Sequence, residues 1–195
     1  QPDVVYINTL TLPHWALAAW LARIPVVTHV RELESQIDTM LSRALTGQLL
    51  LCKRIIANSE ATRNYILRDW PRLRTIVRVI YNGLPLPQAR SPQSALPAPR
   101  IAVIGRLSPR KGQDVAIRAL QKLHDQGVDA TLEFFGDVFP GYEWFENDLR
   151  SLASTLGLDS RIEFHGYHRD PWSKMPFDIA LVPSRLEPFG NVAAE

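Results

Sequence analysis

Two carboxylates stand near the end of the sequence with a spacing that suits one extended polar ligand. Glu187 and Glu195 are separated by seven residues. Carboxylates accept charge-assisted hydrogen bonds, which sugar and ribose hydroxyls can donate. Gly190 and Asn191 lie between them, where a helix is expected to begin, and free backbone N–H groups at a helix start can hold phosphate or sugar oxygens. The segment is therefore a candidate binding site.

A basic loop lies about 80 residues upstream, over Gly105-Arg106-Leu107-Ser108-Pro109-Arg110-Lys111-Gly112. Arg106 offers a planar fork for phosphate oxygens, and Lys111 adds a mobile point charge. Gly105 and Gly112 permit tight backbone turns. These residues suit a diphosphate, although a turn of this composition is often only a solvated connection. The order of residues matches neither a Walker loop nor a Gly-x-Gly-x-x-Gly dinucleotide fingerprint.

The elements that must position these residues alternate between short apolar runs and longer amphipathic stretches. Each candidate segment follows an apolar run, so both are expected at the carboxyl ends of strands, where open α/β sheets bind ligands. Alternating strands and helices predict parallel sheets covered on both faces. We expect strands over residues 3–8, 24–30, 54–58, 75–81, 100–104, 130–135, 161–164 and 178–182. We expect helices over residues 13–23, 35–51, 59–70, 113–125 and 142–156, and a further helix beginning at 189.

A proline-rich stretch divides the two strand–helix series. Residues 84–99 include five prolines and show no periodicity, which is typical of a semi-rigid linker. The sequence therefore predicts an α/β protein of two Rossmann-like, doubly wound lobes with a cleft between them. Residues 1–84 would belong to the N-terminal lobe, residues 85–99 to the linker, and residues 100–195 to the C-terminal lobe.

The two candidate segments together resemble the motifs of family 4 glycosyltransferases, which have the GT-B fold. The Glu-x7-Glu element with Pro-Phe-Gly after its first Glu is the most specific of them. Other segments are similar to that family's second-strand glycine turn, its base-lining segment and its acceptor-lobe features: Phe135-Gly136-Asp137, Phe164-His165-Gly166-Tyr167, Ile56-Ala57-Asn58-Ser59-Glu60 and Tyr81-Asn82-Gly83. The resemblance further implies that strand–helix units precede Asp3 and that the last helix continues, so that the chain is a fragment with two incomplete lobes.

The resemblance also implies that residues 1–84 form the acceptor-side lobe and residues 100–195 the donor-binding lobe, and it gives a role to each matched residue. Arg106 and Lys111 would bind the donor diphosphate and stabilise the leaving group, and Glu187 would contact donor-sugar hydroxyls. The ligand would also meet Phe189, Gly190 and Asn191 through the backbone, Glu195 at the ribose, Gly105 and Gly136 at the turns, and Tyr167 at the base. His29 is a further candidate for the active site, but it alternates with Arg31, and the sequence does not decide which of the two faces the cleft.

The implied activity is retaining transfer of a sugar from a UDP- or GDP-linked donor to an unknown acceptor, either a glycan, a lipid or a polysaccharide precursor. No metal or other cofactor is expected. A nucleotide-sugar epimerase of the same fold and a non-catalytic nucleotide-sugar-binding module are the alternatives. Nucleic acid is not an expected partner, because the basic residues lack interleaved aromatics and no reader motif is present.

Charge is distributed unevenly along the chain. Residues 1–99 carry a net charge of +5 and residues 100–195 a net charge of −3, and seven basic residues lie between Lys53 and Arg78. This cluster could contact an anionic membrane or an acidic acceptor, or it could be a solvated helix face. No run approaches the roughly 20 apolar residues that span a bilayer. Cys52 is the only cysteine, is expected to be a buried thiol, and leaves no internal disulfide. We expect a cytoplasmic protein that could lie at the inner face of the membrane.

Overall fold

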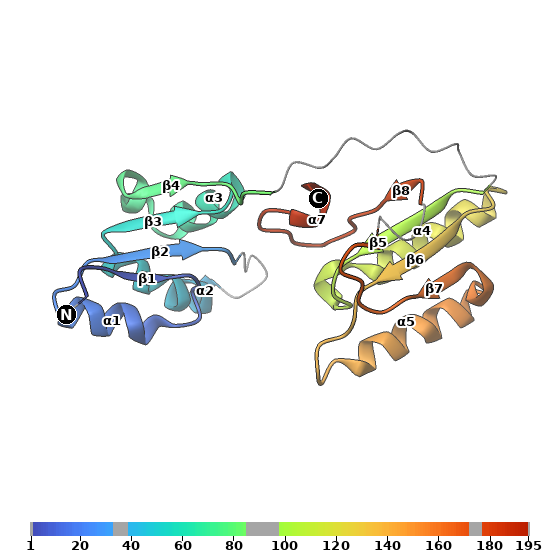
Figure 1. Cartoon of the computed structure of the whole chain (residues 1–195), viewed down its shortest axis with the longest axis horizontal. Helices are drawn as coiled ribbons and strands as arrows, with labels where there is room; N and C mark the ends of the chain where they lie inside the picture. Colours follow the sequence, from blue (N-terminus) through green and yellow to red (C-terminus); the bar gives the residue numbers. More distant parts are fainter. Residues whose placement is uncertain (1, 33–38, 85–97, 172–176, 195) are drawn as a thin grey trace. The chain divides into compact units, whose positions relative to one another are not determined.

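The computed structural model describes residues 2–32, 39–84, 98–171 and 177–194, and the chain divides into two compact units (Figure 1). The first unit consists of Gln1–Pro85 and Leu186–Asn191, and the second of Leu86–Arg185 and Val192–Glu195. Each unit is built on a four-stranded sheet in which every pairing is parallel. The predicted α/β fold class is therefore confirmed.

The first unit contains a sheet whose spatial order, β1-β2-β3-β4, follows the chain. Its strands are β1 (Val5–Ile7), β2 (Val26–Val30), β3 (Arg54–Ala57) and β4 (Val77–Val79). Its helices are α1 (Pro13–Leu21), α2 (Thr39–Thr46) and α3 (Glu60–Asp69), with 3-10 turns at η1 (Gly47–Leu51) and η2 (Pro71–Thr75). Helix α3 begins at an N-cap, because the Ser59 side chain accepts a hydrogen bond from Thr62 N at 3.0 Å. Such a cap stabilises a helix by about 1 kcal/mol.

One predicted helix of the first unit is shorter than expected. The pattern favoured a helix over residues 35–51, of which 35–38 lie outside the described residues, but α2 ends at Thr46 and gives way to the 3-10 turn η1. Gly47 lowers the helix propensity at this point. The buried Gln48 Nε2 donates to the carbonyl oxygens of Leu10 at 2.5 Å and Leu45 at 2.9 Å. The hydrogen bond from Gln48 to Leu10 stabilises the tighter 3-10 turn.

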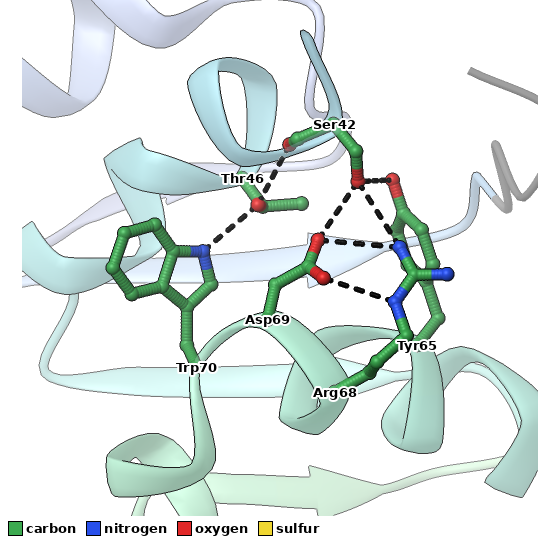
Figure 2. Close-up of polar contacts among 6 residues, drawn as sticks. All are labelled: Ser42, Thr46, Tyr65, Arg68, Asp69 and Trp70. Carbon is green, nitrogen blue, oxygen red and sulfur yellow. Dashed lines mark hydrogen bonds and ion pairs between the residues drawn. The ribbon is translucent and has the colours of Figure 1, made fainter. Parts of the chain in front are cut away.

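Polar side chains join α2 to α3, as Figure 2 shows. The buried Asp69 carboxylate accepts hydrogen bonds from Ser42 Oγ at 2.8 Å and from Arg68 Nε at 2.9 Å. The bond from Arg68, with help from Ser42, holds the pKa of Asp69 below its ordinary value. Nearby, Trp70 Nε1 donates to Thr46 Oγ1 at 2.9 Å. These bonds fix the two helices without leaving a charge unpaired.

The second unit contains a sheet in which strands are added on both sides of the first strand of the unit. The strands are β5 (Arg100–Ile104), β6 (Thr131–Phe135), β7 (Ile162–Phe164) and β8 (Ile179–Ala180), arranged β7-β6-β5-β8. Successive strands are added on one side of β5, and then β8 is added on the other. The sheet therefore has a switch point between β5 and β8, and open α/β sheets bind ligands at the carboxyl ends of strands at such a point.

The helices of the second unit agree closely with the sequence predictions. Among the described residues they are α4 (Gln113–Asp125) and α5 (Glu143–Thr155), with 3-10 turns at η3 (Pro109–Lys111) and η4 (Asp159–Arg161). The short α7 (Asn191–Ala194) begins at the last residue grouped with the first unit and continues in the second. The apolar residues of α4 and α5 bury Phe134 of β6 completely. One charged group lies inside the sheet: Glu133 accepts a hydrogen bond from Arg100 Nε at 2.6 Å and lies 3.1 Å from His165 Nε2.

Within the described parts of the chain, no helix has the length and apolar character needed to cross a membrane.

Candidate active site

The loop that follows β5 lies at the switch point of the second unit's sheet, beside the segment that follows β6. Gly105 N donates to Phe135 O at 2.8 Å, and Leu107 N donates to Asp137 O at 3.0 Å. A Cβ added at Gly136 would lie 2.2 Å from Gly105 O, and Gly136 has φ +151°. Only glycine therefore allows this close approach. Packing requires glycine at position 136, which is also a residue of the predicted site.

The two predicted phosphate-binding side chains lie in this loop. Arg106 is exposed, and its guanidinium carbon lies 4.8 Å from the centroid of the Phe139 ring. Lys111 is half-buried, and its Cε lies 3.9 Å from the place that a Cβ on Gly105 would take. The Lys111 side chain therefore lies against the start of the loop, so that both ends of the loop meet around the glycine at its first position.

A buried glutamine supports the first half of the loop. Gln113 is fully buried at the start of α4, its Nε2 donates to Arg106 O at 2.9 Å, and its Oε1 accepts from Ser108 N at 3.4 Å. Sequence reasoning missed this residue, because a glutamine at a helix start carries no distinctive signal. Since the amide satisfies both backbone groups, Arg106 is presented on a fixed backbone.

The second half of the loop packs against the segment that follows β8. Gly112 has φ +69°, and a Cβ there would lie 2.2 Å from Pro183 O. Arg185 donates to both carboxylate oxygens of Asp114, at 2.9 and 2.6 Å, and to Pro109 O at 2.6 Å. The hydrogen bond from Arg185 holds the pKa of Asp114 below its ordinary value. The segment after β8 therefore holds the loop in its observed shape.

The predicted base-lining residue lies next to the turn after β6. Tyr167 N donates to Asp137 Oδ1 at 3.1 Å, and the Tyr167 side chain is 70% exposed. Gly136 N donates to Gly166 O at 2.8 Å, which joins this segment to the same turn. Tyr167 therefore lies close to Gly136 with an exposed side chain, and the Asp137 carboxylate accepts a hydrogen bond from the Tyr167 backbone.

The acidic segment, residues 187–195, belongs in part to the first unit, with which Leu186–Asn191 are grouped. Within that unit, Ser59 Oγ donates to Pro188 O, Asn82 Nδ2 donates to Asn191 Oδ1 at 2.8 Å, and the rings of Tyr81 and Phe189 lie 6.0 Å apart. Helix α7 begins at Asn191, two residues after the expected start at 189 and directly after Gly190 with φ +87°. Glu187 is half-buried, and Glu195 lies outside the described residues.

His29 lies near the end of β2 in the first unit. Its Nδ1 is 2.9 Å from Tyr6 Oη, and its buried Nε2 has no hydrogen-bond partner among the described residues. Burial, together with the positive charge of Arg31, lowers the pKa of His29, so that the imidazole is neutral near pH 7. Arg31 itself is exposed. A neutral imidazole with one unused nitrogen could donate to or accept from a ligand hydroxyl.

Comparison with known proteins identifies relatives that each match about half of the chain. Over 100 residues the chain is 36% identical to D-inositol 3-phosphate glycosyltransferase of Corynebacterium glutamicum (strain R), covering 49% of this chain and 24% of that protein. Over 101 residues it is 31% identical to mannosylfructose-phosphate synthase of Agrobacterium fabrum, covering 49% and 22%. The chain thus spans about a quarter of the length of these relatives.

Solved structures extend the similarity to almost the whole chain. Anabaena Alr3699/HepE, solved in complex with UDP and glucose, has a TM-score of 0.80 and 25% sequence identity, over 97% of this chain and 55% of that one. The same protein in complex with UDP-glucose gives the same TM-score and identity. The apo form of the lipopolysaccharide outer core galactosyltransferase WaaB, at 18% identity and a TM-score of 0.72, shares the fold.

Family models match both parts of the chain. Residues 1–87 match the model for Glycosyltransferase Family 4, in agreement with the resemblance seen in the motifs. Residues 88–195, which are more than half of the chain and contain the basic loop and the acidic segment, match the model for glycosyl transferases group 1. The chain therefore belongs to the glycosyl transferases group 1 family.

Proposed function

We propose that this protein transfers a sugar from a nucleotide-diphosphate sugar to an acceptor, with retention of anomeric configuration. The observation that carries the proposal is the basic loop at the switch point of the second sheet, where Gly105 and Gly136 approach closely and Arg106 and Lys111 stand on a supported backbone. Fixed cations at this position suit a diphosphate leaving group, whose negative charge grows as the glycosidic bond breaks.

Each site residue has a role in the proposal. Arg106 and Lys111 bind the diphosphate, Glu187 binds donor-sugar hydroxyls, and Glu195 binds the ribose. The ring of Tyr167 contacts the base, since it is exposed next to the Gly136 turn. The backbone of Phe189, Gly190 and Asn191 meets the sugar and phosphate. His29 contributes its unused Nε2 to the donor or acceptor sugar.

The proposed donor is a UDP-linked sugar, and a GDP-linked sugar is the alternative. Support for uridine comes from Anabaena Alr3699/HepE, whose complexes contain UDP and UDP-glucose and which superposes on 97% of this chain. The acceptor is a glycan, a lipid or a polysaccharide precursor. No cofactor beyond the donor is proposed.

A donor panel with matched variants tests the proposal. We expect UDP to bind more tightly than GDP or ADP in calorimetry, and Lys111→Ala or Arg106→Ala to weaken UDP about 10- to 100-fold, the loss of one charge-assisted hydrogen bond. The controls are Lys122→Ala and Arg118→Ala, exposed residues of the same types on α4, which should leave binding unchanged. Equal effects at loop and control positions would refute the assigned diphosphate site.

The same assay separates the alternatives. A transferase releases the nucleoside diphosphate only when an acceptor is present, whereas an epimerase converts the donor without an acceptor, and a binding module does neither. Adding a panel of glycan and lipid acceptors to the UDP-sugar and measuring UDP release therefore distinguishes the three. In the intact enzyme we expect Lys111→Ala to lower turnover by about 10²- to 10³-fold, the usual cost of one transition-state donor.

A basic patch on the first unit favours an anionic membrane as a further partner, at the inner face of a cytoplasmic membrane. The guanidinium groups of Arg43 and Arg72 each lie 5.5 Å from the Trp70 ring centroid, and Met40 and Leu41 of α2 are 80% and 53% exposed. Cations beside exposed apolar side chains suit an anionic bilayer surface. Co-sedimentation with vesicles containing 30% anionic lipid should fall for Arg43→Glu but not for Arg118→Glu, and equal loss would refute the patch.

A further inference from the structure

We propose that Arg185 is a positioning residue for the diphosphate: it holds the basic loop in its binding shape and keeps the carboxylate of Asp114 away from the anion. The inference rests on the proposed function and deepens it, because it assigns a role to two residues outside the predicted site. It concerns only the second unit.

Arg185 makes four hydrogen bonds to three residues around one turn. Its Nη1 donates to Asp114 Oδ1 at 2.9 Å and to Pro109 O at 2.6 Å, and its Nη2 donates to Asp114 Oδ2 at 2.6 Å. Its backbone N donates to Arg110 O at 2.9 Å. The planar fork of arginine can bridge a carboxylate in this bidentate way, and the single ammonium of lysine cannot reproduce it.

The three partners of Arg185 lie on both sides of Lys111 in the sequence. Pro109 and Arg110 precede it in η3, and Asp114 follows it in the first turn of α4. Fixing the backbone on both sides of Lys111 fixes the direction in which its side chain leaves the loop, against Gly105. The turn cannot relax toward the segment after β8 either, because Gly112 already meets Pro183 there.

Asp114 gives the arrangement a second effect, which is electrostatic. An acidic residue three positions after Lys111 is unfavourable in a loop that binds a diphosphate, unless its charge is neutralised. Arg185 pairs with it through both oxygens and keeps it ionised, as the lowered pKa of Asp114 indicates. Without Arg185, the freed carboxylate would repel the diphosphate and compete for the cations of the loop.

The pair contributes little to the stability of the fold. The side chains of Arg185 and Asp114 are 40% and 29% exposed, and ion pairs with this much solvent contact stabilise proteins only weakly. Variants at these positions should therefore fold. A change in ligand binding would then report on the loop and not on unfolding.

The experiment is calorimetric titration of the pairs UDP/UMP and GDP/GMP into the whole chain and its variants. For the nucleotide that binds, Arg185→Ala should weaken the diphosphate about tenfold or more and the monophosphate less than about threefold, because the monophosphate makes fewer contacts with the loop. Arg185→Lys should fall in between. The double variant Arg185→Ala/Asp114→Asn should bind the diphosphate more tightly than Arg185→Ala alone, because the freed charge is gone.

The matched control is Arg150→Ala, which removes a two-bond contact between Arg150 and Glu146 on α5 of the same unit. It should leave all four affinities unchanged, and melting curves of every variant should stay close to that of the wild type. The inference is overturned if Arg185→Ala weakens diphosphate and monophosphate equally, or neither, or if Asp114→Asn gives no rescue. Failure of the wild-type chain to bind any of these nucleotides would instead overturn the proposed function, and this inference with it.

Discussion

Replacing Gly112 by alanine should damage both the stability of the second unit and its affinity for nucleotide. Gly112 occupies the left-handed region at φ +69°, and the added Cβ would stand 2.2 Å from Pro183 O. A suitable comparison lies in the same unit: Gly157 has φ +68°, and a Cβ there would have nothing within 4 Å. The two substitutions therefore share the backbone strain and differ only in the clash.

The magnitudes follow from these two terms. A left-handed conformation costs a residue other than glycine about 1–2 kcal/mol. Protein Cβ atoms essentially never approach another atom within 3.0 Å, so the loop at Gly112 must also move by at least 0.8 Å. Overpacking of this kind costs about 1–3 kcal/mol. We therefore expect Gly157→Ala to lower the free energy of unfolding by about 1–2 kcal/mol and Gly112→Ala by about 2–5 kcal/mol.

Urea unfolding followed by circular dichroism measures both values, and calorimetry with UDP measures the consequence for binding. A misplacement of about 1 Å in groups that position a reacting substrate can cost about 10²-fold in rate. Gly112→Ala should therefore lose UDP affinity and turnover, while Gly157→Ala should keep both. Equal destabilisation by the two substitutions would show that the contact with Pro183 does not constrain the loop.

Three further outcomes follow from buried groups. Glu133→Leu leaves Arg100 and His165 without their shared carboxylate and should lower the free energy of unfolding by about 3 kcal/mol in urea titrations. The control, Glu163→Leu on the paired strand, should change the free energy of unfolding little, because the Glu163 side chain is 72% exposed. Similar losses at the two positions would contradict this prediction. Because the pKa of Asp69 is lowered, its contribution to stability is complete above about pH 4 and is lost as the pH falls through the folded-state pKa. The destabilisation by Asp69→Asn, measured by denaturation curves, should therefore shrink below about pH 4. A difference that does not depend on pH would argue against the bond from Arg68 as the cause. Burial raises the pKa of the Cys52 thiol, so a thiol reagent at pH 8 should label the chain in urea but not in buffer, and rapid labelling in buffer would contradict its burial beside Thr28.

The sequence predicts most of the local structure, because local structure here follows from apolar periodicity and end signals. Helix α4 begins and ends at the predicted residues, 113 and 125, and β5 occupies the predicted range 100–104. Ser59, where the helix over residues 59–70 is expected to begin, is the N-cap of α3. The helix expected over residues 35–51 is wrong over residues 47–51, where a side-chain bond to a carbonyl 38 residues away outweighs the local pattern.

The candidate site is predictable in its residue types but not in its supports. A Gly–Arg–Lys turn after a strand indicates phosphate chemistry, and the loop does lie at the switch point. Gly112 must be glycine because a Cβ there would clash with the carbonyl oxygen of Pro183, 71 residues later in the chain. Asp114 pairs with Arg185, which is also 71 residues away. No periodicity or spacing encodes such a contact. The roles of Glu187 and His29 stay predictions, since they depend on a bound ligand.

The assignment of Leu186–Asn191 to the first unit has a consequence for biosynthesis. Leu186 packs on the first unit's core, and the partners Ser59–Pro188 and Asn82–Asn191 are separated by 129 and 109 residues of chain. During translation the N-terminal part of a chain usually folds first. Here the first unit would leave the ribosome with part of its apolar surface uncovered, and it would complete its packing only after Leu86–Arg185 of the second unit had been synthesised. Chaperone contact with nascent chains should therefore persist well beyond residue 85 and end after residue 191 has emerged.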